Sequence, residues 1–280
     1  MQTPNIVYDQ EREDGHWLFT MDELGNDKGM IAKGRDARWS PDRTQLVYTS
    51  QRDKTFSIFV MSTEDATERQ ITFGDEVDLN PSWSPDGKKI VFTSITPKQK
   101  SSSTETSRRK ILIMDIDGND VQELTHEIAG AFSSAVWHPG GQYLAVNSSR
   151  SGSSELHLIS ESGNYISQLT ETSGSDISGM HIDWSPDGDH LLFTSLRSGI
   201  VSIYVIKKNG ESETRLTQDD RRINACGRWS PDGSQIVFHS TPSGPFDEVL
   251  SLSEIFLMRA DGSEIRQITS SNFSNGHPDW

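Results

Sequence analysis

The sequence predicts an all-β chain that folds as a single six-bladed β-propeller with four-stranded blades. A tryptophan recurs at intervals of 44 to 54 residues, which is the repeat length of propeller blades; these residues are Trp39, Trp83, Trp137, Trp184, Trp229 and Trp280. Each of the first five is followed by a Pro-containing turn and then by an apolar strand in constant register. A repeat that keeps its register along the whole chain indicates one closed ring.

The repeat over residues 80–125 shows how each element is predicted. Strand a ends at Trp83, and the Ser-Pro-Asp-Gly sequence at 84–87 predicts a tight turn, because proline presets φ, aspartate accepts backbone hydrogen bonds and glycine adopts φ > 0. Strands b and c follow at 89–94 and 111–114, and strand d ends the repeat. The apolar runs of strands b and c are typical of strands buried on both faces between neighbouring blades.

Strand d ends in a shared signature, an isoleucine or leucine followed by a threonine; the threonines are Thr72, Thr125, Thr170, Thr217 and Thr269. The N-terminal repeat lacks its tryptophan, but residues 5–8 and 17–20 have the pattern of strands b and c, followed by a degraded strand d near 29–32. Trp280 supplies the missing strand a. We therefore expect the ring to close by pairing the C-terminal strand a with the N-terminal strands b to d, which leaves no exposed sheet edge.

We expect one domain over residues 1–280, divided into six blades. The predicted ranges for blades 1 to 6 are, in turn, 1–35 with 276–280, 36–79, 80–133, 134–180, 181–225 and 226–275. A seventh blade would require a repeat that the pattern does not contain.

The composition argues against two classes of interaction. The net charge is −15, with 26 Lys and Arg against 41 Asp and Glu, so we expect no nucleic acid, whose phosphates require clustered cations. No apolar run approaches about 18 residues, which predicts no membrane insertion. The first ten residues lack the charged and apolar regions of a signal peptide. We expect a soluble, acidic monomer without an internal disulfide, because Cys226 is the only cysteine.

The Trp-Ser-Pro-Asp-Gly turn, the aliphatic–aromatic strand b and the Leu-Thr end of strand d resemble the TolB-type propeller repeat over nearly the whole chain. Two turns depart from it, with Pro-Asp-Arg at 41–43 and His-Pro-Gly-Gly at 138–141. The resemblance implies a protein partner bound at one face and a periplasmic or other extracytoplasmic location in bacteria. TolB carries a signal peptide and an α/β domain before its propeller, so this chain resembles the propeller domain alone. Related propellers accompany prolyl-oligopeptidase-like hydrolases or form metal-dependent uronate lyases, and the fold does not choose among them.

One polar position recurs three residues before each tryptophan, at the start of the innermost strand. It holds Asp36, Asn80, Ser134, His181, Cys226 and His277. If these side chains point into the central channel, they form a ligand-binding ring around the axis. Two imidazoles and a carboxylate suit a divalent cation, so His181, His277 and Asp36 are the predicted metal ligands. A hydrated channel or another small polar ligand is the alternative, and the sequence leaves the cofactor open.

The b–c loops and the d–a connections carry the variation in length, and they share one face of a propeller. We expect a partner to bind this loop face, because the opposite face is built from stereotyped turns. Acidic and aromatic residues in two d–a connections form the predicted partner site: Phe73, Asp75, Glu76, Asp78, Asp219 and Asp220. Two long loops, 96–109 and 241–253, belong to the same face.

The sequence therefore favours a non-catalytic binding or scaffold propeller that engages a protein or peptide at the loop face and the channel mouth. Two alternatives stay open. One is a metal-dependent polysaccharide lyase or hydrolase that uses the channel site, with Asp183 or Asp279 as base; the other is an accessory domain of a larger protein. No nucleophile elbow, phosphate loop or metalloprotease motif supports a catalytic role.

Overall fold

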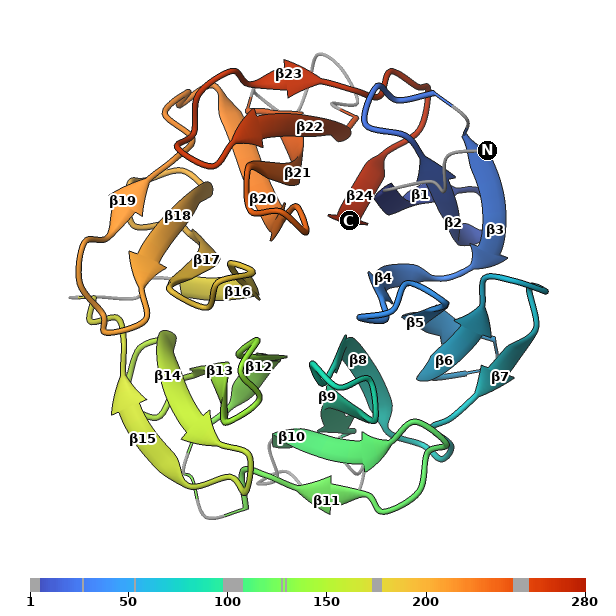
Figure 1. Ribbon diagram of the computed structural model, residues 1–280, viewed down its shortest axis with the longest axis vertical. Coiled ribbons are helices and arrows are strands. Elements are labelled where there is room, and N and C mark those ends of the chain that lie inside the picture. Colours follow the sequence, from blue (N-terminus) through green and yellow to red (C-terminus); the bar gives the residue numbers. More distant parts are fainter. Residues whose placement is uncertain are drawn as a thin grey trace.

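The computed structural model describes residues 6–26, 28–52, 54–97, 108–126, 128, 130–172, 178–243 and 252–280. Within these ranges the regular elements are β-strands, and six four-stranded antiparallel sheets surround a central axis. Figure 1 shows the ring along this axis, with one strand of each sheet beside the centre. The predicted fold class, an all-β six-bladed propeller, is confirmed.

Each blade contains strands a to d from the axis outward. Blade 1 consists of β24 (Asn275–Asp279), β1 (Ile6–Arg12), β2 (Gly15–Met21) and β3 (Gly29–Lys33); blade 2 of β4 (Arg35–Trp39), β5 (Gln45–Gln51), β6 (Phe56–Ser62) and β7 (Glu68–Gln70); blade 3 of β8 (Val77–Trp83), β9 (Lys89–Thr96), β10 (Arg108–Asp115) and β11 (Gln122–Glu123). Blade 4 consists of β12 (Phe132–Trp137), β13 (Tyr143–Ser148), β14 (Glu155–Ser160) and β15 (Tyr165–Gln168); blade 5 of β16 (Ser178–Trp184), β17 (His190–Ser195), β18 (Ser202–Lys207) and β19 (Thr214–Arg215); blade 6 of β20 (Arg222–Trp229), β21 (Gln235–Pro242), β22 (Glu254–Arg259) and β23 (Arg266–Gln267).

The ring closes through β24, which pairs antiparallel with β1 across the two ends of the chain. Val7 lies opposite Asp279, and Gln10 lies opposite Asn275. The Gln10 side chain donates a hydrogen bond to Asn275 Oδ1 at 2.9 Å, and Asn275 Nδ2 donates to Glu254 Oε2 at 2.7 Å. Figure 1 shows β24 beside β1 at the centre of the ring. This is the closure predicted from the position of Trp280, and it covers the inner edge of β1.

The repeated Ser-Pro-Asp turn is held by its serine and its aspartate. Ser84 Oγ donates to Asp86 Oδ1 at 2.6 Å and accepts the Lys89 amide hydrogen at 2.9 Å, which ties the turn to strand b. The same two contacts recur at Ser40, Ser185 and Ser230. In the divergent turn His138 replaces the serine, and its Nδ1 accepts the Gly140 amide hydrogen at 3.0 Å. The motif thus encodes a turn, and the divergent turn of blade 4 keeps a side-chain hydrogen-bond acceptor at the position of the serine.

The threonine after strand d links that strand to strand c. Its Oγ1 accepts a backbone amide hydrogen near the start of strand c, as in Ile203 to Thr217 at 3.0 Å and Ile58 to Thr72 at 2.9 Å. The bond recurs at Thr125, Thr170 and Thr269. Each of these amides is buried and needs an acceptor, which explains why the threonine recurs.

The apolar core lies between the blades rather than within one of them. Val136 and Leu156 of blade 4, for example, pack in one cluster with Trp184 and Phe193 of blade 5. Among the described residues, a cluster of this kind occupies each of the six interfaces between neighbouring blades. This packing accounts for the apolar runs of strands b and c, whose two faces both meet another blade.

Candidate ligand site in the central channel

Five of the six predicted channel residues occupy a β-bulge in the innermost strand. The pairing of strands a and b skips at this point in blades 1, 2, 3, 5 and 6. The bulged residues have left-handed φ angles, 53° at Asp36, 53° at Asn80, 53° at His181, 57° at Cys226 and 42° at His277. Asp, Asn and His adopt this conformation more readily than other non-glycine residues. The recurring polar position is therefore partly a backbone requirement, and the bulge re-aims the side chain that it carries.

Ser134 and Cys226 depart from this pattern in opposite ways. Ser134 pairs with Asn147 of strand b, and the register skips at the preceding residue. Cys226 has the left-handed backbone without belonging to the residue types that favour it. A strained residue persists where its surroundings hold it, and such residues gather at functional sites. The backbone of Cys226 therefore directs attention to its side chain.

A layer of charges closes the channel on the side of the Ser-Pro-Asp turns. Arg38 Nη1 lies 3.2 Å from Asp183 Oδ1 and 3.1 Å from Asp279 Oδ1, and so joins blades 2, 5 and 1. Arg228 Nε lies 3.9 Å from Asp279 Oδ1. Burial alone would lower the pKa of Arg38, but Asp279 and Asp183 outweigh it and raise that pKa. In four of the six blades the residue before the tryptophan thus belongs to an ion-pair layer across the axis.

Behind this layer lies a cavity of about 20 Å³ in the channel. Its lining includes Asp36, Asn80, Ser134 and His181, from the successive blades 2 to 5. The volume is sufficient for roughly one water molecule or one ion. The structure therefore brings these four predicted channel residues to one level of the axis.

His181, Cys226 and His277 come from the neighbouring blades 5, 6 and 1 and form a compact group. One ligand atom of each, an imidazole nitrogen or the thiol sulfur, lies within 4.8 Å of the other two. Asp36 lies beside this group: its Oδ1 is 3.6 Å from His277 Nε2. The predicted pair of histidines is thus brought together, but Cys226 takes the third place that the sequence assigned to Asp36.

Burial and nearby charges set the protonation of this group. Burial lowers the pKa of His181 well below its usual value, and His277 adds to the effect. Burial also raises the pKa of the Cys226 thiol well above its usual value. For His277, burial alone would lower the pKa, but Asp36 and then Asp9 outweigh it and raise the pKa to about 9. Asp9 Oδ1 lies 2.8 Å from His277 Nδ1, so a buried carboxylate holds this ring from behind.

On the turn side of the ion-pair layer lies a funnel that the sequence did not predict. The funnel has a volume of about 380 Å³, and Arg38, Asp183 and Asp279 are part of its lining. Its wall also contains the six repeat tryptophans and the prolines of the turns, Pro41, Pro85, Pro139, Pro186 and Pro231. Trp83 Nε1 donates to the Arg38 carbonyl of the neighbouring blade at 3.1 Å. The sequence feature that could have predicted the funnel is the tryptophan, which recurs once per blade at the channel mouth.

Phe73 is the most exposed aromatic residue in the described part of the loop face. Its side chain is 75% exposed, although it is aromatic. It borders a pocket of about 650 Å³ that is also lined by Phe59, Arg52 and Asp75. Arg52 donates to the Glu68 carboxylate from both Nη atoms, at 2.5 and 2.7 Å, and this pair fixes one wall of the pocket.

The other predicted partner residues of this connection differ in exposure. Asp75 is exposed, Glu76 is half-buried, and Asp78 is only 6% exposed. Asp78 pairs with Ser94 in the sheet of blade 3, and burial raises its pKa. Asp75 and Glu76 are therefore placed to contact a partner, whereas Asp78 can support the connection from below.

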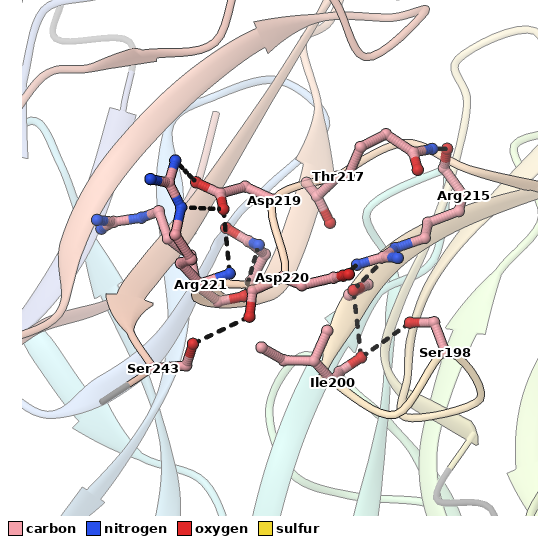
Figure 2. A network of polar contacts seen from close by, with 12 residues as sticks. Ser198, Ile200, Arg215, Thr217, Asp219, Asp220, Arg221 and Ser243 are labelled. Carbon is pink, nitrogen blue, oxygen red and sulfur yellow. Dashed lines mark hydrogen bonds and ion pairs between the residues drawn. The ribbon is translucent and has the colours of Figure 1, made fainter. Parts of the chain in front are cut away.

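Asp219 and Asp220 lie in the connection between β19 and β20, and both are paired with arginines (Figure 2). Asp219 Oδ1 accepts from the Arg221 backbone amide at 3.0 Å and from Arg221 Nε at 2.9 Å. Asp220 Oδ1 accepts from Arg215 Nη2 at 2.6 Å, and its carbonyl accepts from Ser243 Oγ at 3.1 Å. These local ion pairs reduce the pull of the two acids on a cationic partner. Of the two long loops, 98–107 and 244–251 lie outside the described residues.

The fold and the channel define a β-propeller, and the sequence match specifies its family. The chain belongs to the TolB beta propeller domain family, whose sequence model matches residues 20–125 and 97–280. It is 30% identical over 92 residues to the uncharacterized protein Atu1656 of Agrobacterium fabrum, an alignment that covers 33% of this chain and 28% of that protein. The matched part thus spans less than a third of that relative.

Two solved structures share the fold. TolB from Acinetobacter baumannii has a TM-score of 0.79 at 21% identity, over 99% of this chain and 66% of that chain. An oligogalacturonate lyase in complex with manganese has a TM-score of 0.62 at 14% identity, over 96% of this chain and 74% of that chain. At these identities the likeness concerns architecture, and function has to be argued from the residues. No helix in the described ranges is long and apolar enough to span a membrane.

Proposed function

We propose that this chain is a non-catalytic binding propeller that engages a protein or peptide through its loop face, with Phe73 as the central contact. The resemblance to the TolB propeller, which implies a protein partner, supports this proposal. The observation that carries the proposal is the 75% exposure of Phe73 beside a pocket of about 650 Å³. An exposed aromatic ring at the edge of a pocket offers apolar area that a partner can bury.

The pocket is built to receive an anchor side chain. Its base is Phe59, which is 5% exposed and lies beneath the Arg52 guanidinium at 4.7 Å. Glu68 holds this guanidinium in place, so the base does not need to be ordered when a partner binds. We expect an aliphatic or aromatic residue of the partner to pack against Phe73 and the Arg52 guanidinium, with Asp75 at the rim.

A photo-crosslinking amino acid at position 73 tests this placement, with the same residue at position 24 as the matched control. Leu24 is 72% exposed, close to the value for Phe73, but it lies in the turn between β2 and β3 on the opposite face. Each variant is irradiated in a lysate of the source organism, and the crosslinked proteins are identified by mass spectrometry. We expect one protein to be captured from position 73 and not from position 24.

The captured protein is then purified, and its affinity for the chain is measured by calorimetry. Phe73→Ala is expected to weaken binding by about 2 kcal/mol, or roughly thirtyfold, as truncation of an aromatic hot spot does. Leu24→Ala should leave the affinity unchanged. Capture from position 24 alone, or equal affinities of Phe73→Ala and wild type, contradicts the proposal.

The enzymatic alternative receives less support from the geometry. Asp183 and Asp279 are its predicted bases, and both contact Arg38. Asp183 Oδ2 also accepts the Trp229 amide hydrogen at 2.9 Å, and Asp279 Oδ2 accepts that of Trp39 at 3.0 Å. These contacts engage both carboxylates in the channel wall. We extend the binding proposal to an extracytoplasmic bacterial setting, which the family resemblance supports.

A further inference from the structure

We propose that the central channel binds one thiophilic transition-metal ion, Zn²⁺ in the first place, through His181, Cys226 and His277. The three side chains come from blades 5, 6 and 1, and ring closure brings their ligand atoms within 4.8 Å of one another. This assignment changes the ligand set expected from the sequence, since Cys226 replaces Asp36 as the third ligand.

The separation of the ligand atoms suits a metal ion after small side-chain rotations. Nitrogen and sulfur ligands lie about 2.0 to 2.3 Å from a tetrahedral zinc ion, which puts them roughly 3.3 to 3.8 Å from one another. Binding therefore requires rotations about χ1 and χ2 that close the remaining gap. Three protein ligands leave a fourth position for water or for Asp36, whose Oδ1 is 3.6 Å from His277 Nε2.

Asp9 supplies a second observation that is independent of the proximity of the three ligands. Its Oδ1 lies 2.8 Å from His277 Nδ1, so Nδ1 carries the hydrogen and Nε2 is the nitrogen that faces the group. Metal-binding histidines are commonly oriented by a carboxylate in this way. Asp9 is 2% exposed, so the pair is a built part of the channel wall rather than a surface contact.

The backbone of the three residues points to the same centre. Each lies in a bulge with a left-handed φ, and a bulge re-aims its side chain. The bulge recurs at this position in five blades, so the conformation of Cys226 follows from the repeat. In blade 6 the bulge places a cysteine, rather than a carboxylate or an amide, beside the two histidines.

The ligand chemistry selects the metal. Thiolate and imidazole favour Zn²⁺ and similar ions, whereas Mn²⁺, Mg²⁺ and Ca²⁺ favour oxygen ligands. The manganese of the lyase with the same fold is therefore not carried over to this chain. On binding, the thiol of Cys226 and Nε2 of His277 each release a proton to solvent, and the two lone pairs bind the ion.

We expect the ion to enter from the loop face. His16 Nδ1 lies 3.0 Å from Asp9 Oδ2, and the side chains of His16 and His277 are 30% and 23% exposed. On the turn side, the ion pairs of Arg38 with Asp183 and Asp279 close the channel.

A cobalt titration of the purified full chain tests the site. The protein is stripped with a chelator, reduced, and titrated with Co²⁺, and Zn²⁺ is then added as competitor. We expect one ion per chain, the charge-transfer absorption of a cobalt–thiolate bond, displacement of cobalt by zinc, and a rise in Tm with Zn²⁺. The absence of a tightly bound ion, or binding without the thiolate absorption, overturns the proposal.

Three variants separate the ligands from their surroundings. Asp9→Asn keeps all three ligands and should weaken Zn²⁺ binding by about 10- to 100-fold, while Cys226→Ser should weaken it further and abolish the thiolate absorption. Asp261→Asn, in the exposed turn between β22 and β23, is the matched control for Asp9→Asn and should bind as wild type does. Unchanged affinity of Cys226→Ser, or an equal loss in Asp261→Asn, assigns the ion elsewhere and overturns the site. The wild-type cobalt spectrum decides the question even where a variant fails to fold.

Discussion

Arg38 is the residue that balances the charges of the channel. Two carboxylates from different blades meet its guanidinium, Asp183 at 3.2 Å and Asp279 at 3.1 Å. Without this arginine, both acids would face each other in a buried layer. Removing one partner of a buried ion pair is more destabilising than the pair itself is stabilising, because an unpaired charge is left behind.

We therefore expect Arg38→Met to lower the free energy of unfolding by about 3 to 5 kcal/mol. Urea unfolding followed by circular dichroism measures the change. Adding Asp279→Asn to the same chain should restore most of the loss, because Asp183 and the buried Arg228 then remain as one opposite-charge pair. Arg259→Met, which breaks an exposed pair with Glu264, is the control and should change little. A small loss in Arg38→Met would contradict the role given to this layer.

At the residue scale, the sequence predicted the level of the channel side chains but not which of them meet. The constant register of the repeat places the residue three positions before each tryptophan at one depth along the axis. It does not show that this position is a β-bulge, because Asp, Asn and His are common both in a polar channel lining and at positions with a left-handed backbone. The sequence therefore favoured Asp36 over Cys226 as the third candidate ligand, because a carboxylate is a common ligand whereas a lone cysteine carries no spacing signal.

At the scale of the elements, strand d depends on its threonine. Thr217 is 2% exposed, and its Oγ1 accepts the Ile203 amide hydrogen at 3.0 Å. Thr217→Val keeps the shape of the side chain but leaves this amide without its acceptor. We expect a loss of about 1 to 3 kcal/mol in the free energy of unfolding, the desolvation penalty of a buried unpaired group.

Thr217→Ser is the matched variant, since it keeps the hydroxyl and loses only a methyl group. Thr269→Val should be the most destabilising of the three, because the Thr269 hydroxyl also donates to the buried carboxylate of Glu254. Chemical denaturation of the three variants gives the order. A Thr217→Val variant as stable as wild type, together with a destabilised Thr217→Ser variant, would show that the methyl group, not the hydroxyl, explains the recurring threonine.

The strands were predictable because the same sequence pattern recurs in every blade. Because the N-terminal repeat lacks its tryptophan, Trp280 predicted that the C-terminal strand completes the first blade. In the structure β24 pairs with β1, as predicted. The short strands d were located by their threonines. The funnel on the turn side was not predicted. A recurring turn such as 84–87 indicates backbone geometry, but it does not show how much space is left between its copies around the ring.

At the scale of the whole molecule, the chain is held in a ring by one shared blade. Strand a of blade 1 comes from one end of the sequence and strands b to d from the other, so opening the ring breaks the hydrogen bonds between β24 and β1. At each of the six interfaces between neighbouring blades the contacts include an apolar cluster, such as Leu192 with Phe238. Circular permutation can move or remove the shared blade without changing a single contact side chain.

Two permutants, each with Trp280 joined to Met1 by a short Gly-Ser linker, isolate the contribution of the shared blade. New ends between Asp187 and Gly188 fall in the turn between β16 and β17, and so make blade 5 the shared blade. New ends between Gln218 and Asp219 fall between blades 5 and 6, so that no blade is shared. We expect the first permutant to unfold near the wild-type urea midpoint. The second should unfold at a lower midpoint with a broader transition, because the ring can open there without breaking a sheet. Equal midpoints for the two would mean that apolar packing between blades is sufficient to close the ring, and that the β24–β1 pairing adds no stability of its own.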